Sequence, residues 1–186
     1  CIRDREYFEA MHKVSTNVNT VLTRLIEVHE TYQRKPALEM LDLTMEVVET
    51  VEKLEKYAEG QGIEFETVLG AEGPWKSDKH LLNLIIENMV RNAMLYKIRV
   101  GARVTIKTEY RNEGLVITVE DNGYGIQPGD EPKAFNIFFK GSPMPGGTGL
   151  EIYISKIAVE KLGGHVKLLR PKKNTIFEFT MPMVEN

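Results

Sequence analysis

Two asparagines lie four residues apart in a strongly apolar segment of the chain. Asn88 and Asn92 fall within Lys79 to Lys97, where Leu, Ile, Met and Val predominate, and this pattern predicts a helix. A spacing of four places both amides on one face of that helix. Because amides on an apolar face need partners, they either cap neighbouring loops or bind a ligand. An Asn side-chain oxygen can bind Mg²⁺, a hard cation that keeps several waters and bridges phosphates.

A carboxylate follows a second apolar segment. Leu115 to Glu120 predicts a strand, and Asp121 to Gly125 continues directly from it. Gly123 and the glycine that ends this run allow the backbone to turn tightly and to approach a flat ligand. A buried Asp can accept a hydrogen bond from the exocyclic amine of adenine, whereas guanine has an acceptor at the corresponding position. Since Asp, Asn and Gly are also ordinary turn residues, the same run is compatible with a plain turn.

Glycine is concentrated in Gly141 to Gly149, which predicts a loop, and Leu150 to Leu162 predicts the helix that follows it. The free N–H groups and the positive dipole end of such a helix attract phosphate. Lys140 stands just before the loop. This is not a Walker P-loop, because no Gly-Lys-Ser/Thr follows the glycines. The alternative is a mobile surface loop without a ligand.

The remaining segments supply the elements that must position these residues. Thr44 is predicted to cap a helix that ends near Glu59, before Gly60 and Gly62. A hairpin is predicted around the turn at 111–114. Helices and mostly antiparallel strands in mixed order predict an α/β (α+β) sandwich, with one mixed sheet and helices over one face. The predicted strands are Ala37 to Leu43, Ile63 to Leu69, Arg103 to Tyr110, Leu115 to Glu120, His165 to Arg170 and Thr175 to Met181.

The first part of the chain predicts a long helix. Tyr7 to Gln33 contains neither Gly nor Pro, and Pro36 ends it. Its apolar residues alternate spacings of three and four, as in a heptad seam. The helix either dimerises in a coiled coil or four-helix bundle, or packs on its own domain. We expect residues 1–36 to form a dimerisation helix and residues 37–186 a separate domain. The seam consists of Met11, Val14, Val18, Val21, Leu25, Val28 and Tyr32.

Composition narrows the classes of protein further. The chain has 186 residues, of which 42% are hydrophobic, and this is enough for a core. Its net charge of -3 comes from interspersed acids and bases, so we expect no nucleic-acid partner. The single cysteine, Cys1, cannot form an internal disulfide, which favours a reduced, cytoplasmic setting. No apolar run approaches the roughly 20 residues that span a bilayer, so we expect no direct membrane contact by this segment, although a longer parent could be membrane-bound.

Taken in this order and spacing, the motifs resemble those of the sensor histidine kinases in the GHKL ATPase superfamily. The resemblance extends nearly continuously from Leu38 to Pro182 and implies a Bergerat-type ATP-binding fold, with residues 37–186 as the catalytic domain. The matching segments are Glu87 to Ala93 for the N box, Asp121 to Ile126 for the first glycine box, Phe135 to Lys140 for the F box and Gly147 to Leu150 for the second glycine box.

This resemblance implies roles for individual residues. Asn88 would hold Mg²⁺, Asn92 would help to order the phosphates of ATP, and Asp121 would bind the adenine amino group. The other implied nucleotide-binding residues lie around the base or in a lid over the phosphates. They are Tyr96, Gly123, Gly125 and Ile126 near the base, and Lys140, Gly147, Thr148, Gly149 and Leu150 near the phosphates.

Two residues depart from the family pattern. Glu151 stands where the family usually repeats glycine after Leu150, and Leu95 replaces the common basic residue before Tyr96. An acid beside phosphates is repulsive unless it points away. We therefore expect reduced nucleotide affinity or turnover.

The phosphorylated histidine of such kinases has one weak candidate here. The sequence after His12 faintly resembles the family's histidine box, but Lys13 stands where the family places an acid that takes the histidine proton. Only one helix is predicted between His12 and the ATP-binding domain, whereas the family places its histidine on the first of two hairpin helices. We therefore expect Tyr7 to Gln33 to be the second dimerisation helix, with the phosphoacceptor upstream of Cys1.

The resemblance thus implies the catalytic region of a histidine kinase that binds Mg-ATP. It would donate the γ-phosphoryl group to a histidine outside this chain, for relay to a response regulator, and would form a homodimer through the N-terminal helix. Two alternatives remain. One is another GHKL ATPase, such as an anti-sigma serine kinase. The other is a degenerate nucleotide-binding scaffold, which is suggested by Glu151 and Leu95.

Overall fold

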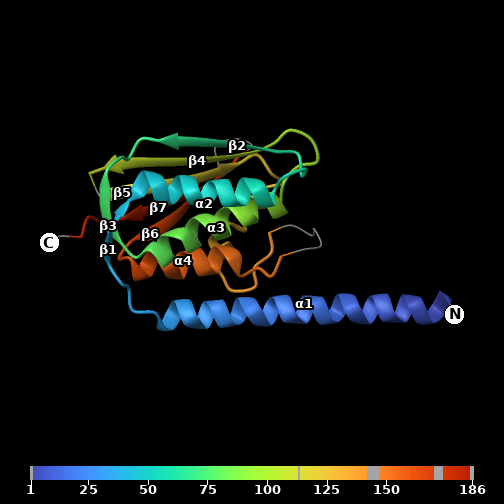
Figure 1. Cartoon of the computed structure of the whole chain (residues 1–186). Helices are drawn as coiled ribbons and strands as arrows, with labels where there is room; N and C mark the ends of the chain where they lie inside the picture. The colour runs from blue at the N-terminus through green and yellow to red at the C-terminus, as the bar shows by residue number, and fades with distance from the viewer. Residues whose placement is uncertain (1, 113, 142–146, 170–173, 185–186) are drawn as a thin grey trace.

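The computed structural model describes residues 2–112, 114–141, 147–169 and 174–184 (Figure 1). A five-stranded sheet forms one layer of the protein. The pair β2–β4 is parallel and the other three pairs are antiparallel, which confirms the predicted mixed, mostly antiparallel sheet. The strands in spatial order are β2 (Ile63–Leu69), β4 (Ala102–Arg111), β5 (Gly114–Asp121), β7 (Thr175–Met181) and β6 (His165–Leu169).

Three helices cover one face of this sheet (Figure 1): α2 (Leu43–Tyr57), α3 (Lys79–Leu95) and α4 (Glu151–Lys161). Successive residues of a strand point to opposite faces, so alternate positions of the central strands contact the helices. The predicted sandwich of one sheet with helices over one face is therefore confirmed. The buried strand residues on the helix side are Val104, Ile106, Leu115, Ile117, Val119, Phe177, Phe179 and Met181.

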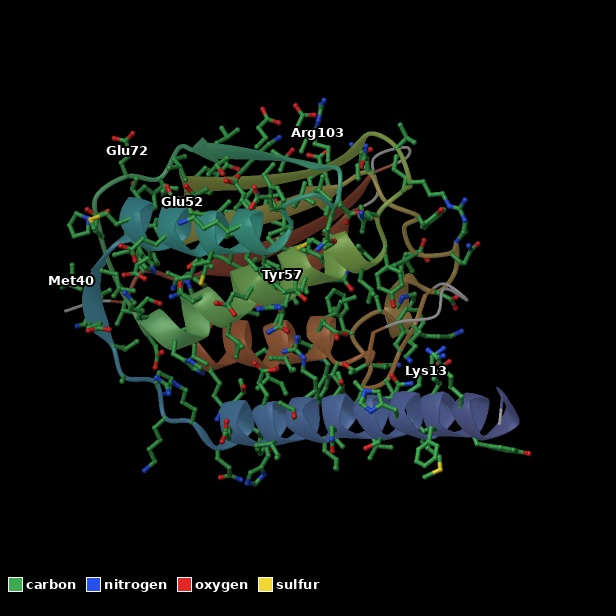
Figure 2. All side chains as sticks on the ribbon, turned by 45° about the vertical axis from the view of Figure 1, so that its right-hand side comes forward. Lys13, Met40, Glu52, Tyr57, Glu72 and Arg103 are labelled. Atoms are coloured by element: carbon green, nitrogen blue, oxygen red, sulfur yellow. The ribbon has the colours of Figure 1, made fainter. Side chains whose placement is uncertain are left out.

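The opposite face of the sheet is polar. Arg111 Nη1 lies 2.7 Å from Glu178 Oε2 of β7, and Lys107 Nζ lies 3.6 Å from Glu120 Oε2 of β5. Arg103 points away from the body of the protein in Figure 2. This alternation of apolar and charged positions fixes the register of the strands, because a slip by one residue would bury the charges.

The N-terminal helix, α1 (Ile2–Gln33), runs beside α4, and its N-terminal end projects beyond the rest of the protein in Figure 1. Leu25 and Val28 pack against the core of the domain. Earlier seam residues, such as Met11 and Val14, are exposed. Packing on its own domain therefore accounts for the last turns of the apolar seam and leaves the first turns uncovered.

A small second sheet precedes the main layers. Strand β1 (Glu39–Asp42) pairs antiparallel with β3 (Pro74–Ser77), a strand that the sequence pattern did not predict. Helix α2 begins at Leu43, so the expected cap at Thr44 is wrong. Asp42 caps the helix instead, since its Oδ1 accepts a hydrogen bond from the Met45 N–H at 3.0 Å.

Hydrogen bonds to Asp78 join the end of α1 and the linker after it to the start of α3. Asp78 caps α3 by accepting a hydrogen bond from the Leu81 N–H at 3.0 Å. The same carboxylate accepts bonds from Arg34 Nε at 2.9 Å, Arg34 Nη2 at 3.1 Å and the Ala37 N–H at 2.8 Å. One buried side chain thus joins the end of α1, the linker and the helix that carries both asparagines.

These elements bring four chain segments together at one end of the sheet. They are the C-terminal end of α3, the end of β5, the start of β7 and the N-terminal end of α4, with the short 3₁₀ helix η1 (Glu131–Lys133) in the connection between β5 and α4. Asp121 and Thr175 are direct partners in the β5–β7 register. Among the described residues, none of the helices combines the length and the hydropathy that a membrane-spanning segment needs.

Candidate functional site

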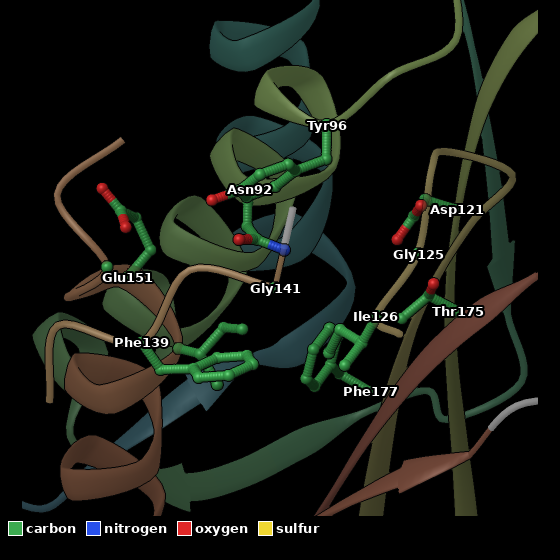
Figure 3. Close-up of a pocket in the computed structure, with 12 residues that line it drawn as sticks. Asn92, Tyr96, Asp121, Gly125, Ile126, Phe139, Gly141, Glu151, Thr175 and Phe177 are labelled. Atoms are coloured by element: carbon green, nitrogen blue, oxygen red, sulfur yellow. The ribbon is translucent and has the colours of Figure 1, made fainter. Parts of the chain in front are cut away.

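A cavity opens where these four segments meet (Figure 3). In Figure 3, Asp121 and Thr175 lie on one side of the cavity and Glu151 on the other, with Phe139 and Phe177 between them. The cavity therefore has an acidic side chain on each of two opposite sides, with aromatic rings between them and Asn92 contributed by α3. Its lining residues are Asn92, Tyr96, Asp121, Gly125, Ile126, Phe139, Gly141, Gly149, Glu151, Ile152, Thr175 and Phe177.

Asp121 provides the carboxylate at the first end. It is the last residue of β5, pairs with Thr175 of β7 and is only 5% exposed. Its Oδ1 accepts a hydrogen bond from the Gly123 N–H at 2.8 Å. Burial raises the pKa of this carboxyl to about 6, helped by the charge of Glu120 and opposed by the Gly123 hydrogen bond. The group is thus an oriented acceptor in a dry environment.

Gly123 allows the turn after β5 to contact the end of α3. A Cβ at this position would lie 2.4 Å from the Tyr96 carbonyl oxygen and 2.7 Å from Asp121 Oδ1. Such distances are sterically excluded, so glycine is required here. The next residue, Tyr124, donates its N–H to the same Tyr96 oxygen at 2.9 Å. These contacts hold the Asp121 turn against α3, although Gly123 itself does not line the cavity.

The two asparagines of α3 have different environments. Asn92 lines the cavity, whereas Asn88 is 1% exposed and lies outside the lining. Asn88 Nδ2 donates to the Leu84 carbonyl oxygen at 2.9 Å. Its Oδ1 is buried and has no hydrogen-bond partner among the described residues. An unpaired buried amide oxygen is costly to the fold, and it is a free ligand atom for a hard cation.

Glu151 forms the opposite end of the cavity by folding back over the start of α4. Its Oε1 accepts a hydrogen bond from Thr148 Oγ1 at 2.9 Å and its Oε2 accepts one from the Leu150 N–H at 3.1 Å. A longer bond of 3.4 Å joins the Thr148 N–H to Oε1. The residue is 8% exposed, and these hydrogen bonds hold its carboxylate at the positive end of the helix.

Gly149 fits the second loop closely against the segment that carries Phe139. Its φ is 73°, in the left-handed region that favours glycine. A Cβ there would lie 2.7 Å from both the carbonyl carbon of Phe138 and the carbonyl oxygen of Phe139. The loop before α4 and the preceding aromatic segment are thus packed as one wall of the cavity.

Six of the twelve predicted nucleotide-site residues line the cavity and six do not. Among the latter, Lys140 is exposed, and Thr148 and Leu150 are buried beneath the start of α4. Ser142 and Gly146, within the predicted glycine loop, lie outside the described residues, as do Cys1 and Arg170. The predicted residues in the lining are Asn92, Tyr96, Asp121, Gly125, Ile126 and Gly149, and those outside it are Asn88, Gly123, Lys140, Gly147, Thr148 and Leu150.

The other six lining residues were not predicted. Thr175 and Phe177 reach the cavity because β7 pairs with β5, and such a register has no signal in local sequence. Phe139 and Gly141 belong to motifs that were recognised without these positions being selected. Glu151 was noticed only as a departure from the family pattern. The unpredicted lining residues are Phe139, Gly141, Glu151, Ile152, Thr175 and Phe177.

Comparison with known proteins defines the class. Residues 77–185, more than half of the chain, match the family described as histidine kinase-, DNA gyrase B-, and HSP90-like ATPase, and the chain belongs to this family. The expected GHKL membership and ATPase-type fold are therefore confirmed. The cavity at the end of the sheet lies within the matched part of the chain.

The relatives are sensor histidine kinases. The chain is 30% identical over 192 residues to the sensor-like histidine kinase SenX3 of Mycolicibacterium smegmatis, covering 96% of this chain and 48% of SenX3. It is 36% identical over 104 residues to the sensor histidine kinase CpxA of Escherichia coli, covering 51% of this chain and 21% of CpxA. The solved structure of the mycobacterial sensor histidine kinase MprB superposes with a TM-score of 0.68 at 25% identity, covering 80% of this chain and all of that one. The chain spans about half the length of SenX3.

Proposed function

We propose that this chain is the ATP-binding catalytic region of a sensor histidine kinase. In this proposal it binds Mg-ATP and donates the γ-phosphoryl group to a histidine that lies outside the chain. The observation that carries the proposal is the buried carboxylate of Asp121 at one end of a cavity that is also lined by the apolar side chains of Ile126 and Phe177. The sensor histidine kinases among the relatives support the same reaction class.

The adenine base is proposed to bind at the Asp121 end. The carboxylate, oriented by the Gly123 N–H, would accept a hydrogen bond from the exocyclic amine of the base. The planar ring would lie on the apolar surfaces of Ile126 and Phe177, with Gly125 allowing close approach. Tyr96 also lines this cavity and completes the proposed base site together with the turn at Gly123.

The phosphates are proposed to extend toward the other end, where α3 and α4 meet. Asn88 is proposed to hold Mg²⁺ through its unpartnered Oδ1, and Asn92 to order the phosphates. An amide oxygen suits Mg²⁺, which keeps several waters and bridges phosphate oxygens. When bound, the ion would neutralise charge on the transferring phosphoryl group. Lys140 and the segment from Gly147 to Leu150 are proposed to form the lid at this end.

The N-terminal part of the chain is proposed to act in assembly. Residues 1–36 would form the second dimerisation helix and residues 37–186 the catalytic domain. The exposed apolar side chains in the first turns of α1, including Met11, Val14 and Val18, support pairing with a second copy. His12 is exposed on this helix and does not line the cavity. The phosphoryl group is therefore proposed to pass to another histidine and then to a response regulator.

The base preference tests this proposal. Guanine presents an acceptor where adenine presents its amine, so the Asp121 carboxylate would repel GTP. We expect GTP to displace a fluorescent ATP analogue at least about tenfold less effectively than ATP does, since a lost charged hydrogen bond costs about 1.5 to 3 kcal/mol. Equal displacement by GTP and ATP would overturn the proposed orientation of the base.

A further inference from the structure

The start of α4 already has an anionic occupant from the protein itself. The Leu150 N–H and the hydroxyl and N–H of Thr148 are donors of the kind that bind phosphate at a helix N-terminus. In this structure all three point at the carboxylate of Glu151. The Glu151 carboxylate thus accepts the hydrogen bonds that a bound phosphate would accept at this helix N-terminus.

The same residue is part of the cavity wall. Glu151 lines it together with Asn92, and Figure 3 places Glu151 on the side opposite Asp121. Asn92 supplies the polar side chain that α3 contributes to this wall, while the unpartnered Oδ1 of Asn88 lies one helical turn earlier, outside the lining. A nucleotide whose base reaches Asp121 would therefore direct its phosphates toward Glu151.

The charge of Glu151 has no salt-bridge partner among the described residues. Its neutralisation comes from hydrogen bonds and from the positive end of α4. Burial raises the pKa of the Tyr96 hydroxyl, which belongs to a residue of the same cavity wall, and the negative charge of Glu151 raises it further. An incoming phosphate would meet this negative charge in a poorly solvated space, where like charges repel strongly.

We infer that Glu151 is a specificity-determining residue, which competes with the terminal phosphates of the nucleotide for the donors at Thr148 and Leu150. The inference rests on the proposed nucleotide site. Its consequence is selective: Glu151 lowers the affinity for nucleotides in proportion to their phosphate charge and leaves the affinity for adenosine nearly unchanged. ATP gains full access to the start of α4 only when the Glu151 side chain turns away.

Glu151→Gln is the direct test, because the amide removes the charge and keeps one oxygen acceptor, which can serve either Thr148 or the Leu150 N–H. Affinities for adenosine, ADP and ATP would be measured by isothermal titration calorimetry with Mg²⁺ present. Glu160→Gln, on the same helix but exposed and outside the cavity, is the matched control. Glu151→Gly, which restores the residue usual in the family, provides a second variant if the first does not fold.

We expect the ratio of ATP affinity to adenosine affinity to rise at least about tenfold in Glu151→Gln and to stay the same in Glu160→Gln. ADP should show an intermediate change. An unchanged ratio, with adenosine still bound, would overturn the role of Glu151 and leave the proposed function intact. Failure of every folded variant to bind either adenosine or ATP would overturn the proposed function, and this inference with it.

Discussion

Arg34 and Asp78 lie 44 positions apart in sequence and are joined by two hydrogen bonds between the guanidinium and the carboxylate. Asp78 is nearly fully buried, and it also caps α3 through the Leu81 N–H. The helix that carries Asn88 and Asn92 is therefore tied at its start to the end of α1. A change in the position of α1 would act directly on the first turn of α3.

Removal of the Asp78 carboxylate should destabilise the domain. We expect Asp78→Ala to lower the free energy of unfolding by about 2 to 4 kcal/mol, because it loses a cap and leaves Arg34 without its partner. Asp42→Ala is the matched control, since Asp42 caps α2 from an exposed position, and it should cost about 1 kcal/mol. Urea denaturation at pH 7 measures both. Equal losses of unfolding free energy in Asp78→Ala and Asp42→Ala would show that the contact with Arg34 adds nothing to the stability of the domain.

The Asp78 contribution should depend on pH. Burial opposes ionisation, but hydrogen bonds from Arg34, Ala37 and Leu81 outweigh it and lower the pKa below 3.8. A lowered carboxyl pKa contributes stability that is fully present above the unfolded value and is lost as pH falls through the folded value. The difference in the free energy of unfolding between wild type and Asp78→Ala should therefore be fully present at neutral pH and become smaller below about pH 3.8.

Replacement of Asn88 should stabilise the fold and weaken Mg²⁺-dependent nucleotide binding. Asn88→Leu removes a buried oxygen without a partner, so we expect the free energy of unfolding to rise by about 1 kcal/mol. The same variant should lose the part of ATP affinity that depends on Mg²⁺ while still binding adenosine. Asn83→Leu, on the same helix, is the control that should destabilise, because Asn83 accepts a hydrogen bond from Thr50 at 3.0 Å. A Mg²⁺ dependence that survives in Asn88→Leu would exclude this residue as the ligand.

Gly123→Ala should disrupt the turn that positions Asp121. The added Cβ would collide with the Tyr96 carbonyl oxygen and with Asp121 itself, so nucleotide binding and stability should both fall. Gly129→Ala is the control for backbone strain without a steric collision. Gly129 has a φ of 91°, which is strained for alanine, but a Cβ there would meet nothing within 4 Å. Titration calorimetry and thermal unfolding of both variants provide the readouts. Wild-type affinity in Gly123→Ala would contradict the described contact between this turn and α3.

The pKa of Asp121 predicts how adenosine binding varies with pH. Burial raises this pKa to about 6, and a protonated carboxyl presents a hydroxyl donor toward the amine of the base. Binding should therefore be constant above about pH 7 and weaken as pH falls through 6, by up to about tenfold per pH unit. Adenosine avoids the titration of phosphates. If adenosine binding to Asp121→Asn weakened with the same pH midpoint as binding to the wild type, the pH dependence could not be assigned to Asp121.

Local pattern was sufficient for much of the fold. The helix at 79–95 and the strands at 63–69 and 175–181 follow directly from apolar periodicity, and the Asp121 turn was visible from its glycines. Strand β3 was missed because it has only four residues and begins with Pro74. The cap at Asp42 was misassigned to Thr44 because Asp42 also belongs to the preceding strand.

The unpredicted part of the site depends on tertiary pairing. Thr175 faces the cavity only because it is the register partner of Asp121, and no property of the sequence around Thr175 specifies that partner. Glu151 could be recognised as unusual from sequence. Its hydrogen bonds to Thr148 and Leu150, which determine how it affects the cavity, required the folded geometry.

The affinity of Asp121→Asn for ATP tests the central claim most directly. Calorimetric titration at pH 8 with Mg²⁺ would compare it with the wild type and with Glu178→Gln, a buried acid on the opposite face of the sheet. The proposed base contact predicts roughly 10- to 100-fold weaker binding in Asp121→Asn and a change of less than about twofold in Glu178→Gln. Wild-type affinity in folded Asp121→Asn would contradict the assignment of this cavity to adenine.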